Sequence, residues 1–255
     1  MSLCIFFGVW SCHWDYTFFV ASFFIFLLTL LCICCIICFE RKKNSVNFTY
    51  FSSSFFLQGD RMGQYFDNEN LPSNMMKTEC FVRGKKFIFH TDNGVFSKDG
   101  LDFGSRLLLE SIPLEAVGGK VLDVGCGYGV FGIIVSKLTP CSVDMVDVNL
   151  RAIHLTEMNI KENHCSNIRV FESNVYENVN SKYSSIITNP PIRAGKKVVY
   201  DIVMNARNYL EEGGSLFLVI RKEQGAKSLI RDLEKIYSVT ILEKKKGFFI
   251  LQCNL

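Results

Sequence analysis

The chain has 255 residues, a formal net charge of +3 at pH 7 and 49% hydrophobic residues. This length allows one or two domains, and so small a net charge does not by itself indicate a nucleic-acid ligand. The eleven cysteines are an odd number without a regular framework, which argues against a disulfide scaffold and is typical of a reducing compartment. The four histidines form no cluster at ligand spacing, so we predict no metal site.

Residues 1–61 form a hydrophobic N-terminal extension whose composition differs from the rest of the chain. The first 39 residues carry one charged side chain, Asp15, and residues 16–39 form an uncharged apolar run long enough to span a bilayer. The basic residues at 41–43 would then stay on the cytoplasmic side. One interpretation is therefore a transmembrane helix at 16–39 that anchors a cytoplasmic domain to the membrane.

The other interpretation is that translation starts at Met62 and that the extension is not translated. Its wealth of Phe, Leu, Ile, Cys and Ser is what U-rich noncoding sequence would give, and residues 58–61 can be encoded by a purine-rich ribosome-binding sequence. The domain would then be cytoplasmic without an anchor. Codons in the gene that break the purine tract would contradict this hypothesis. Residues 62–79 are polar and irregular, and we expect a flexible segment there.

The domain at 80–255 alternates apolar strand patterns with amphipathic helix patterns. We expect one or two strands within 77–89, a short buried strand that contains Val121, Leu122 and Val124, further strands at 141–149, 168–172, 184–188 and 215–220, helices at 105–109, 130–138, 150–162, 198–210 and 227–236, and a terminal hairpin at 238–252. This order predicts a doubly wound, Rossmann-like α/β fold. Its mostly parallel seven-stranded sheet would end in an antiparallel C-terminal hairpin and follow a small N-terminal β segment and a hydrophobic helix.

A glycine-rich turn joins the short strand of Val121, Leu122 and Val124 to the helix at 130–138. The glycines there, Gly125, Gly127 and Gly129, permit positive φ and let the backbone approach a ligand closely. Cys126 lies among them as a small residue that fits the turn. The next strand pattern leads to Asp147, about 20 residues further on, which is the spacing at which an acid contacts a ribose diol. We therefore expect these residues to bind a cofactor that contains a nucleoside.

The same turn matches the dinucleotide pattern G-x-G-x-x-G at 127–132, so an NAD or FAD enzyme is an alternative. Asp123 counts against it, because we place this carboxylate in the turn itself, where it would repel a pyrophosphate at the helix N-terminus. An acid there suits a ligand without phosphate and with a cationic amino-acid end. S-adenosylmethionine is such a ligand, and we predict that Asp123 contributes to its site.

The tetrapeptide Asn189-Pro190-Pro191-Ile192 follows the strand at 184–188 and indicates the chemistry. A planar nitrogen is a poor nucleophile, because its lone pair is delocalised. The side-chain oxygen of Asn189 and the carbonyl of Pro190 can accept hydrogen bonds from its two N–H groups and draw the lone pair out of conjugation. Fixed proline φ angles hold this geometry. We predict that residues 189–192 catalyse N-methyl transfer; an ordinary Asn-Pro turn is the alternative.

Three stretches resemble the class I S-adenosylmethionine-dependent methyltransferases, and within them the methyltransferase small family. They are the cofactor motif at 121–129, the amine-positioning motif at 188–196 and the leading segment at 94–97 and 101–109. The resemblance covers roughly the last three quarters of the chain. It implies methylation of guanine N2 in small-subunit ribosomal RNA, with that RNA or the subunit as partner. Many Asn-Pro-Pro enzymes carry an aromatic residue at the fourth position, where it stacks on a flipped base, whereas this chain has Ile192.

Two alternatives to this function stay open. One is methylation of a protein glutamine at N5, which also uses Asn-Pro-Pro but usually with Tyr next. The other is a non-catalytic RNA-binding or membrane-tethered module.

Further polar and basic residues complete the prediction. Asn174 follows the strand at 168–172, where it would hydrogen-bond the adenine edge or serve as a plain turn residue. Asp102 and Ser105 are expected to line the mouth of the site. Basic residues at 193–197, 221–222 and 244–246 predict contacts with RNA phosphates. For 244–246, a solvated charged face is the alternative.

Overall fold

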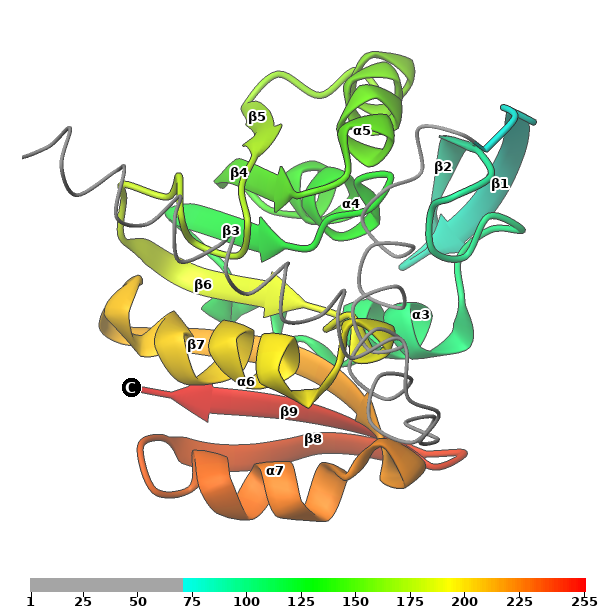
Figure 1. Ribbon diagram of the computed structural model, residues 1–255. Coiled ribbons are helices and arrows are strands. Elements are labelled where there is room, and N and C mark those ends of the chain that lie inside the picture. Colours follow the sequence, from blue (N-terminus) through cyan, green and yellow to red (C-terminus); the bar gives the residue numbers. More distant parts are fainter. Residues whose placement is uncertain (1–70) are drawn as a thin grey trace, which may run out of the picture. The chain divides into compact units, whose positions relative to one another are not determined.

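The computed structural model describes residues 71–255 (Figure 1). The predicted transmembrane helix at 16–39 and the proposed start at Met62 lie outside the described residues. Within the described range, none of the helices has the length and apolar character needed to cross a membrane.

A seven-stranded sheet forms the centre of the domain, with strands in the order β5-β4-β3-β6-β7-β9-β8. The bounds are β3 Lys120–Val124, β4 Ser142–Asp147, β5 Ile168–Glu172, β6 Tyr183–Thr188, β7 Leu210–Arg221, β8 Ser238–Lys245 and β9 Phe248–Asn254. The strands β5, β4, β3, β6 and β7 are parallel, and β9 is antiparallel to both of its neighbours. The predicted doubly wound sheet with its antiparallel C-terminal hairpin is confirmed.

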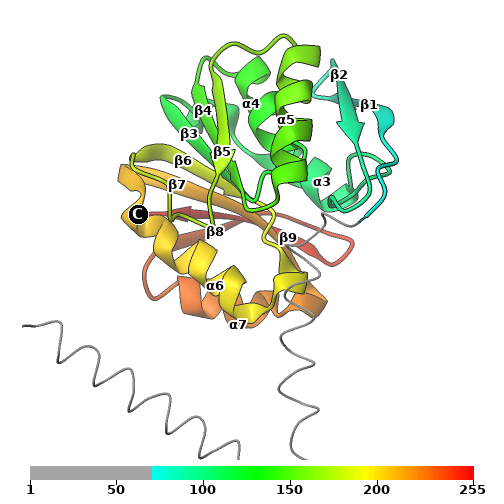
Figure 2. The same ribbon diagram turned by 45° about the horizontal axis from the view of Figure 1, so that its top comes forward.

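Helices cover both faces of the sheet (Figure 2). They are α3 Phe103–Ser111, α4 Val130–Leu138, α5 Leu150–Glu162, α6 Lys196–Asn205 and α7 Ala226–Leu233. On one face, α3, α4 and α5 bury side chains such as Leu108, Ile133 and Leu155 in one apolar cluster. On the other face, α6 and α7 bury Ile202 and Leu229 in a second cluster.

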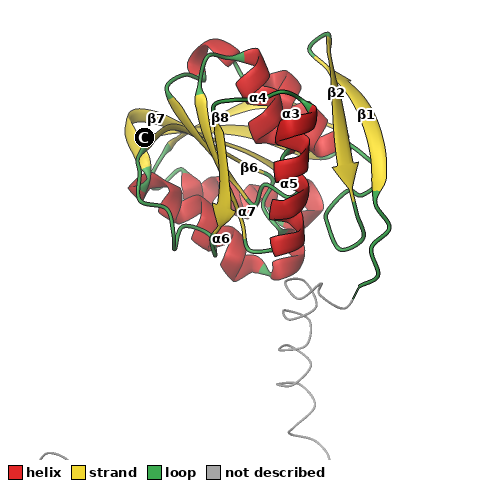
Figure 3. Ribbon diagram, turned by 90° about the horizontal axis from the view of Figure 1, so that it is seen from above, coloured by secondary structure: helices red, strands yellow, loops and turns green. Residues whose placement is uncertain are grey.

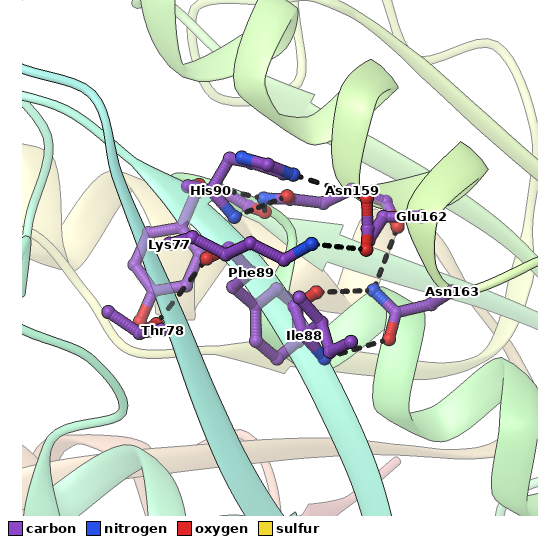
Figure 4. A network of polar contacts seen from close by, with 9 residues as sticks. Lys77, Thr78, Ile88, Phe89, His90, Asn159, Glu162 and Asn163 are labelled. Carbon is purple, nitrogen blue, oxygen red and sulfur yellow. Dashed lines mark hydrogen bonds and ion pairs between the residues drawn. The ribbon is translucent and has the colours of Figure 1, made fainter.

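A separate antiparallel hairpin precedes the sheet and lies beside α5 (Figure 3). Its strands are β1 Met76–Val82 and β2 Lys85–Thr91, so the predicted N-terminal β segment is present, and β1 starts inside the segment at 62–79. Two amide side chains hold the hairpin, one from Asn159 in α5 and one from Asn163, the residue that caps the C-terminus of this helix (Figure 4). Asn159 exchanges two hydrogen bonds with the backbone of His90, at 2.7 and 3.0 Å, and Asn163 does the same with Ile88, at 3.1 and 2.7 Å. These side chains satisfy the outer edge of β2 as a neighbouring strand would.

The element bounds depart from the prediction most clearly after the Asn-Pro-Pro segment. The helix expected at 198–210 ends at Asn205, a 3₁₀ turn follows at Ala206–Asn208, and Leu210 already belongs to β7. The backbone N–H of Tyr183 donates to the carbonyl of Tyr209 at 2.8 Å, which draws the chain into the sheet at this point. Ala206 and Leu210 lie on the two sides of this boundary and both are buried, so their apolar character could not locate it.

Candidate active site

The predicted site residues come together at one edge of the sheet. Asp147 is the last residue of β4, Asn189 directly follows β6, and Asn174 follows β5. Because these strands are parallel, their carboxyl ends lie on the same side, towards the arrowheads of β3 and β6 in Figure 1. In open α/β sheets this edge is where ligands bind.

The glycine-rich turn is tied to the end of β4 by its own backbone. The N–H groups of Gly125 and Cys126 donate to the Val146 carbonyl at 2.9 and 3.0 Å, and the Gly127 N–H donates to Asp147 Oδ2 at 2.8 Å. These donors are therefore engaged with protein acceptors. A pyrophosphate needs several such N–H groups, so this arrangement counts against the dinucleotide alternative.

The glycines of the turn serve different purposes. At Gly125 (φ +73°) and Gly127 (φ +57°), an added Cβ would meet nothing within 4 Å, so both leave open space beside a left-handed backbone. At Gly129 a Cβ would lie 2.9 Å from Thr156 Cγ2, and at Gly132 it would lie 2.2 Å from Met145 Sδ. The last two glycines thus permit close packing of α4 on α5 and β4, whereas the first two leave room for a ligand.

Asp123 differs from the prediction in its position. It belongs to β3 rather than to the turn, and its side chain is fully buried. One oxygen, Oδ2, accepts a hydrogen bond from the Gly132 N–H at 3.0 Å, while Oδ1 has no partner among the described residues. Burial, with a smaller contribution from the nearby charge of Asp147, raises the pKa of this carboxyl group to about 7, and the Gly132 hydrogen bond opposes the shift. The site therefore contains an unsatisfied buried acceptor.

Asp147 is held in place by the backbone on both sides. Its Oδ2 accepts from Gly127 and its Oδ1 accepts from the N–H of Asn149 at 2.9 Å. Burial raises the pKa of Asp147, and the backbone hydrogen bonds oppose that shift. Each carboxylate oxygen keeps a further lone pair for a ligand. Asn174 is exposed, and its carbonyl accepts from the Glu177 N–H at 3.1 Å, so it does close a turn after β5.

Asn189 is oriented by a contact that the sequence did not predict. Its side-chain Nδ2 donates to Ser105 Oγ at 3.0 Å, across 84 positions of the chain. Ser105 is buried in the first turn of α3. That turn is capped by Asp102, whose Oδ1 accepts from the N–H groups of Gly104 and Ser105 at 2.9 and 3.1 Å. The capping pattern was visible in the sequence, but the partner of Ser105 was not.

Of the backbone carbonyls that follow Asn189, the one of Pro190 has no hydrogen-bond donor in the described part of the chain. The carbonyls of Pro191 and Ile192 accept from Ala194 and Gly195, at 3.0 and 3.1 Å, within a 3₁₀ turn. The end of β6 is fixed in turn, because Thr188 Oγ1 donates to the Val124 carbonyl of β3 at 2.8 Å. The segment thus presents an amide oxygen and a carbonyl oxygen from a rigid backbone.

Other sequence predictions have simpler outcomes. Ile192 is half-buried and packs beside the α6 cluster. Cys126 is buried, with its Sγ 3.9 Å from Thr156 Oγ1, as expected of a small residue that fits the turn. Within residues 71–255, no group of His, Cys, Asp and Glu side chains could hold a metal ion.

Comparison with known proteins identifies relatives of this domain. The family model described as methyltransferase small domain matches residues 86–252. The Bacillus subtilis uncharacterized protein YbxB is 42% identical over 194 residues, which cover 74% of this chain and 96% of YbxB. The ribosomal RNA small subunit methyltransferase C of Psychromonas ingrahamii is 34% identical over 165 residues, covering 63% of this chain and 46% of that protein.

A solved structure has the same architecture. The T. thermophilus 16S rRNA N2 methyltransferase RsmC, in complex with AdoMet and guanosine, superposes with a TM-score of 0.65 and 26% identity, covering 72% of this chain and 51% of that one. The chain thus spans about half the length of these two named methyltransferases.

Proposed function

The chain belongs to the methyltransferase small family and uses S-adenosylmethionine, and from this premise we propose that it methylates guanine N2 in small-subunit ribosomal RNA. The observation that carries the proposal is the pair of acceptors at Asn189 Oδ1 and the Pro190 carbonyl, which suits an exocyclic amine with two N–H groups. The names of the methyltransferase C relatives and of the T. thermophilus enzyme support ribosomal RNA as the substrate.

The turn residues fit the cofactor. The open space at Gly125 and Gly127 would admit its amino-acid end, and the unpaired Oδ1 of Asp123 offers an acceptor to a cationic amine, whose charge would favour the ionised form of this carboxyl group. Asp147 would accept from the ribose hydroxyls through its remaining lone pairs, and Asn174 would contact the adenine edge. When bound, S-adenosylmethionine supplies a methyl group on a positively charged sulfur, which is already an activated donor.

The acceptor amine would be oriented by residues 189–192. Its two hydrogens donate to Asn189 Oδ1 and to the Pro190 carbonyl, which turns the nitrogen lone pair towards the methyl carbon. Pro191 fixes the backbone, and Ile192 offers an apolar side chain to the guanine ring. With S-adenosylmethionine held beside it, the oriented nitrogen would accept the methyl group from the sulfur, and its extra proton would leave to water. Orientation of this kind contributes several kcal/mol, on the order of 7 in well-oriented systems.

Ser105 would act as a positioning residue in this arrangement. An amide side chain can present either its oxygen or its NH₂ group to a ligand, and only the oxygen can accept from an amine. Because Nδ2 of Asn189 is held by Ser105 Oγ at 3.0 Å, Oδ1 is the group left for the substrate.

Basic side chains beside the tetrapeptide support a nucleic-acid substrate. Arg193, Lys196 and Lys197 are exposed at the 3₁₀ turn and at the start of α6, immediately after the proposed amine site. An RNA strand places phosphates on either side of its target base, and such cations would bind them.

The test uses the full chain, methyl-labelled S-adenosylmethionine and small ribosomal subunits that lack the modification, followed by nucleoside mass analysis. We expect N2-methylguanine from the wild type, and about a hundredfold less from Asn189→Ala. Asn180→Ala, at an exposed position on the loop before β6, serves as the matched control and should be fully active. Unlabelled RNA together with labelled glutamine in a protein would overturn the proposal. Equal activity of Asn189→Ala and the wild type would overturn the role given to Asn189.

A further inference from the structure

Five basic side chains gather where β7 ends and where β8 turns into β9. They are Arg221, Lys222, Lys244, Lys245 and Lys246, which we call the hairpin patch, and all five are exposed. Two acidic side chains, Glu223 and Glu243, belong to the same segments. Arg221 forms an ion pair with Glu223 at 3.6 Å. In the described part of the chain, the lysines at 244–246 form no ion pair with an acidic side chain. The patch therefore keeps a clear positive charge.

The hairpin patch lies on the same edge of the sheet as Asn189. Arg221 is the last residue of β7, the strand that neighbours β6, and it pairs with Phe248 of β9, which pairs in turn with Lys245 of β8. Neighbouring strands are about 4.8 Å apart, so these residues form a row roughly 10 Å long that leads away from β6. Figure 1 shows the β8–β9 turn on the side of the β3 and β6 arrowheads.

The hairpin is also anchored on the helix that orients Asn189. The rings of Phe248 and Phe103 are 5.5 Å apart, and a Cβ added at Gly104 would lie 2.7 Å from Phe248 Cε1. Gly104 precedes Ser105, whose hydroxyl group holds the Asn189 side chain. The hairpin patch is thus continuous with the amine site through the first turn of α3.

Two of the cations are held over these aromatic rings. Lys246 Nζ lies 4.9 Å from the centre of the Phe103 ring, and Arg221 Cζ lies 4.9 Å from the centre of the Phe248 ring. A ring attracts a cation without neutralising it, so the charge stays available at a defined place. Lysines on an edge strand such as β8 also discourage pairing with other chains, which accounts for Lys244 and Lys245. That explanation does not cover Arg221, on a strand inside the sheet, or Lys246, in the turn.

We propose that the hairpin patch binds the phosphates of the RNA strand that flanks the target guanine. This inference rests on the proposed function, because it assigns a binding surface to the substrate of that reaction. A base that enters the site carries its neighbouring nucleotides to the carboxyl edge of the sheet. The row from Arg221 to Lys245, with Lys246 beside it, offers these phosphates exposed positive charge, and the two lysines form no ion pair with an acid in the described part of the chain.

The test removes three charges of the hairpin patch with the substitutions Arg221→Gln, Lys245→Gln and Lys246→Gln in the full chain. The probe is a fluorescent RNA hairpin from the small subunit, and its affinity is measured by anisotropy from low to high salt. We expect affinity at low salt to fall roughly tenfold and the salt slope to decrease by about 2, since each phosphate that is no longer neutralised lowers the slope by about 0.7. The KM for RNA should rise in parallel, while kcat at saturating RNA stays within about twofold.

The matched control removes three exposed lysines at the opposite, amino edge of the sheet. They are Lys137 at the end of α4, Lys161 at the end of α5 and Lys182 just before β6. The RNA affinity and the salt slope of this control variant should equal those of the wild type. Equal losses in both triple variants, or no loss in the first, would overturn the inference.

The binding measurement also separates the two proposals. A wild type that leaves RNA unmethylated would overturn the proposed function. In that case the anisotropy result would still decide whether the hairpin patch binds RNA.

Discussion

Replacing Ser105 with Ala should slow methyl transfer without weakening cofactor binding. The substitution removes the 3.0 Å hydrogen bond that fixes the Asn189 amide, while the cap of α3 by Asp102 stays intact. A hydrogen bond of this kind has a net value of about 0.5–1.5 kcal/mol, which corresponds to a fall in rate of roughly 2- to 12-fold. Asn189→Ala removes the acceptor itself and should cost about a hundredfold.

The assay is the single-turnover rate with saturating RNA, together with the KM for S-adenosylmethionine and the melting temperature of each variant. We expect kcat to fall, the KM for the cofactor to hold, and Ser105→Thr, which keeps the hydroxyl group, to recover most of the rate. The decisive measurement is the double variant. If Ser105 acts only through Asn189, Ser105→Ala should cost nothing further in the Asn189→Ala background. Rate losses that multiply in the double variant would refute the reasoning.

Three further predictions concern stability and cofactor binding. Saturating S-adenosylmethionine, at about a hundred times its Kd, should stabilise the wild type by roughly 2.7 kcal/mol, read as a rise in melting temperature. Gly127→Ala should fold but lose most of this rise, whereas Gly132→Ala, which drives a Cβ into Met145, should lower the melting temperature with or without the cofactor. The raised pKa of Asp123 means that the folded state favours the protonated carboxyl group, so the free energy of unfolding should fall as pH rises from about 4 to about 7. Asp123→Asn should flatten this pH dependence, measured by urea unfolding at several pH values. A pH dependence equal to that of the wild type would contradict the raised pKa of Asp123. Asn159→Leu should lower the free energy of unfolding in urea by about 2–4 kcal/mol, because it leaves backbone groups of His90 and Tyr128 without their partner. A loss below about 0.5 kcal/mol would contradict that account.

The sequence predicted those elements whose boundaries coincide with a change in apolar pattern. The helices at 130–138 and 150–162 and the strand at 168–172 have the predicted bounds. Gly129 marks the start of the first helix, and Asn149 caps the second through the N–H groups of Arg151 and Ala152. Where apolar residues continue across a boundary, as between α6 and β7, the pattern alone could not find it.

The candidate site was predictable as a set of residues but not as a set of contacts. Strand ends in a parallel sheet converge, so Asp147 and Asn189 could be placed on one edge from the order of elements alone. Asp123 was assigned to the turn, and the structure puts it inside β3, because a carboxylate with one backbone partner can be buried there. The contact between Ser105 and Asn189 depends on how α3 packs against β7 and β9, which no local pattern encodes.

Helix α3 precedes the alternating strands and helices of the sheet, and yet it reaches the candidate site. The need to orient the amide group of Asn189 accounts for this position. The sheet delivers Asn189 to its edge, but among the described residues no hydrogen bond joins the Asn189 side chain to β6. A hydroxyl group from a separate helix supplies that orientation, and the same helix receives the β8–β9 hairpin at Gly104. One turn of α3 thus connects the side chain proposed to orient the amine with the cations proposed to bind the RNA strand. Gly104→Ala, which would push Phe248 away, should therefore raise the KM for RNA and lower kcat together, whereas Ser105→Ala should lower kcat alone.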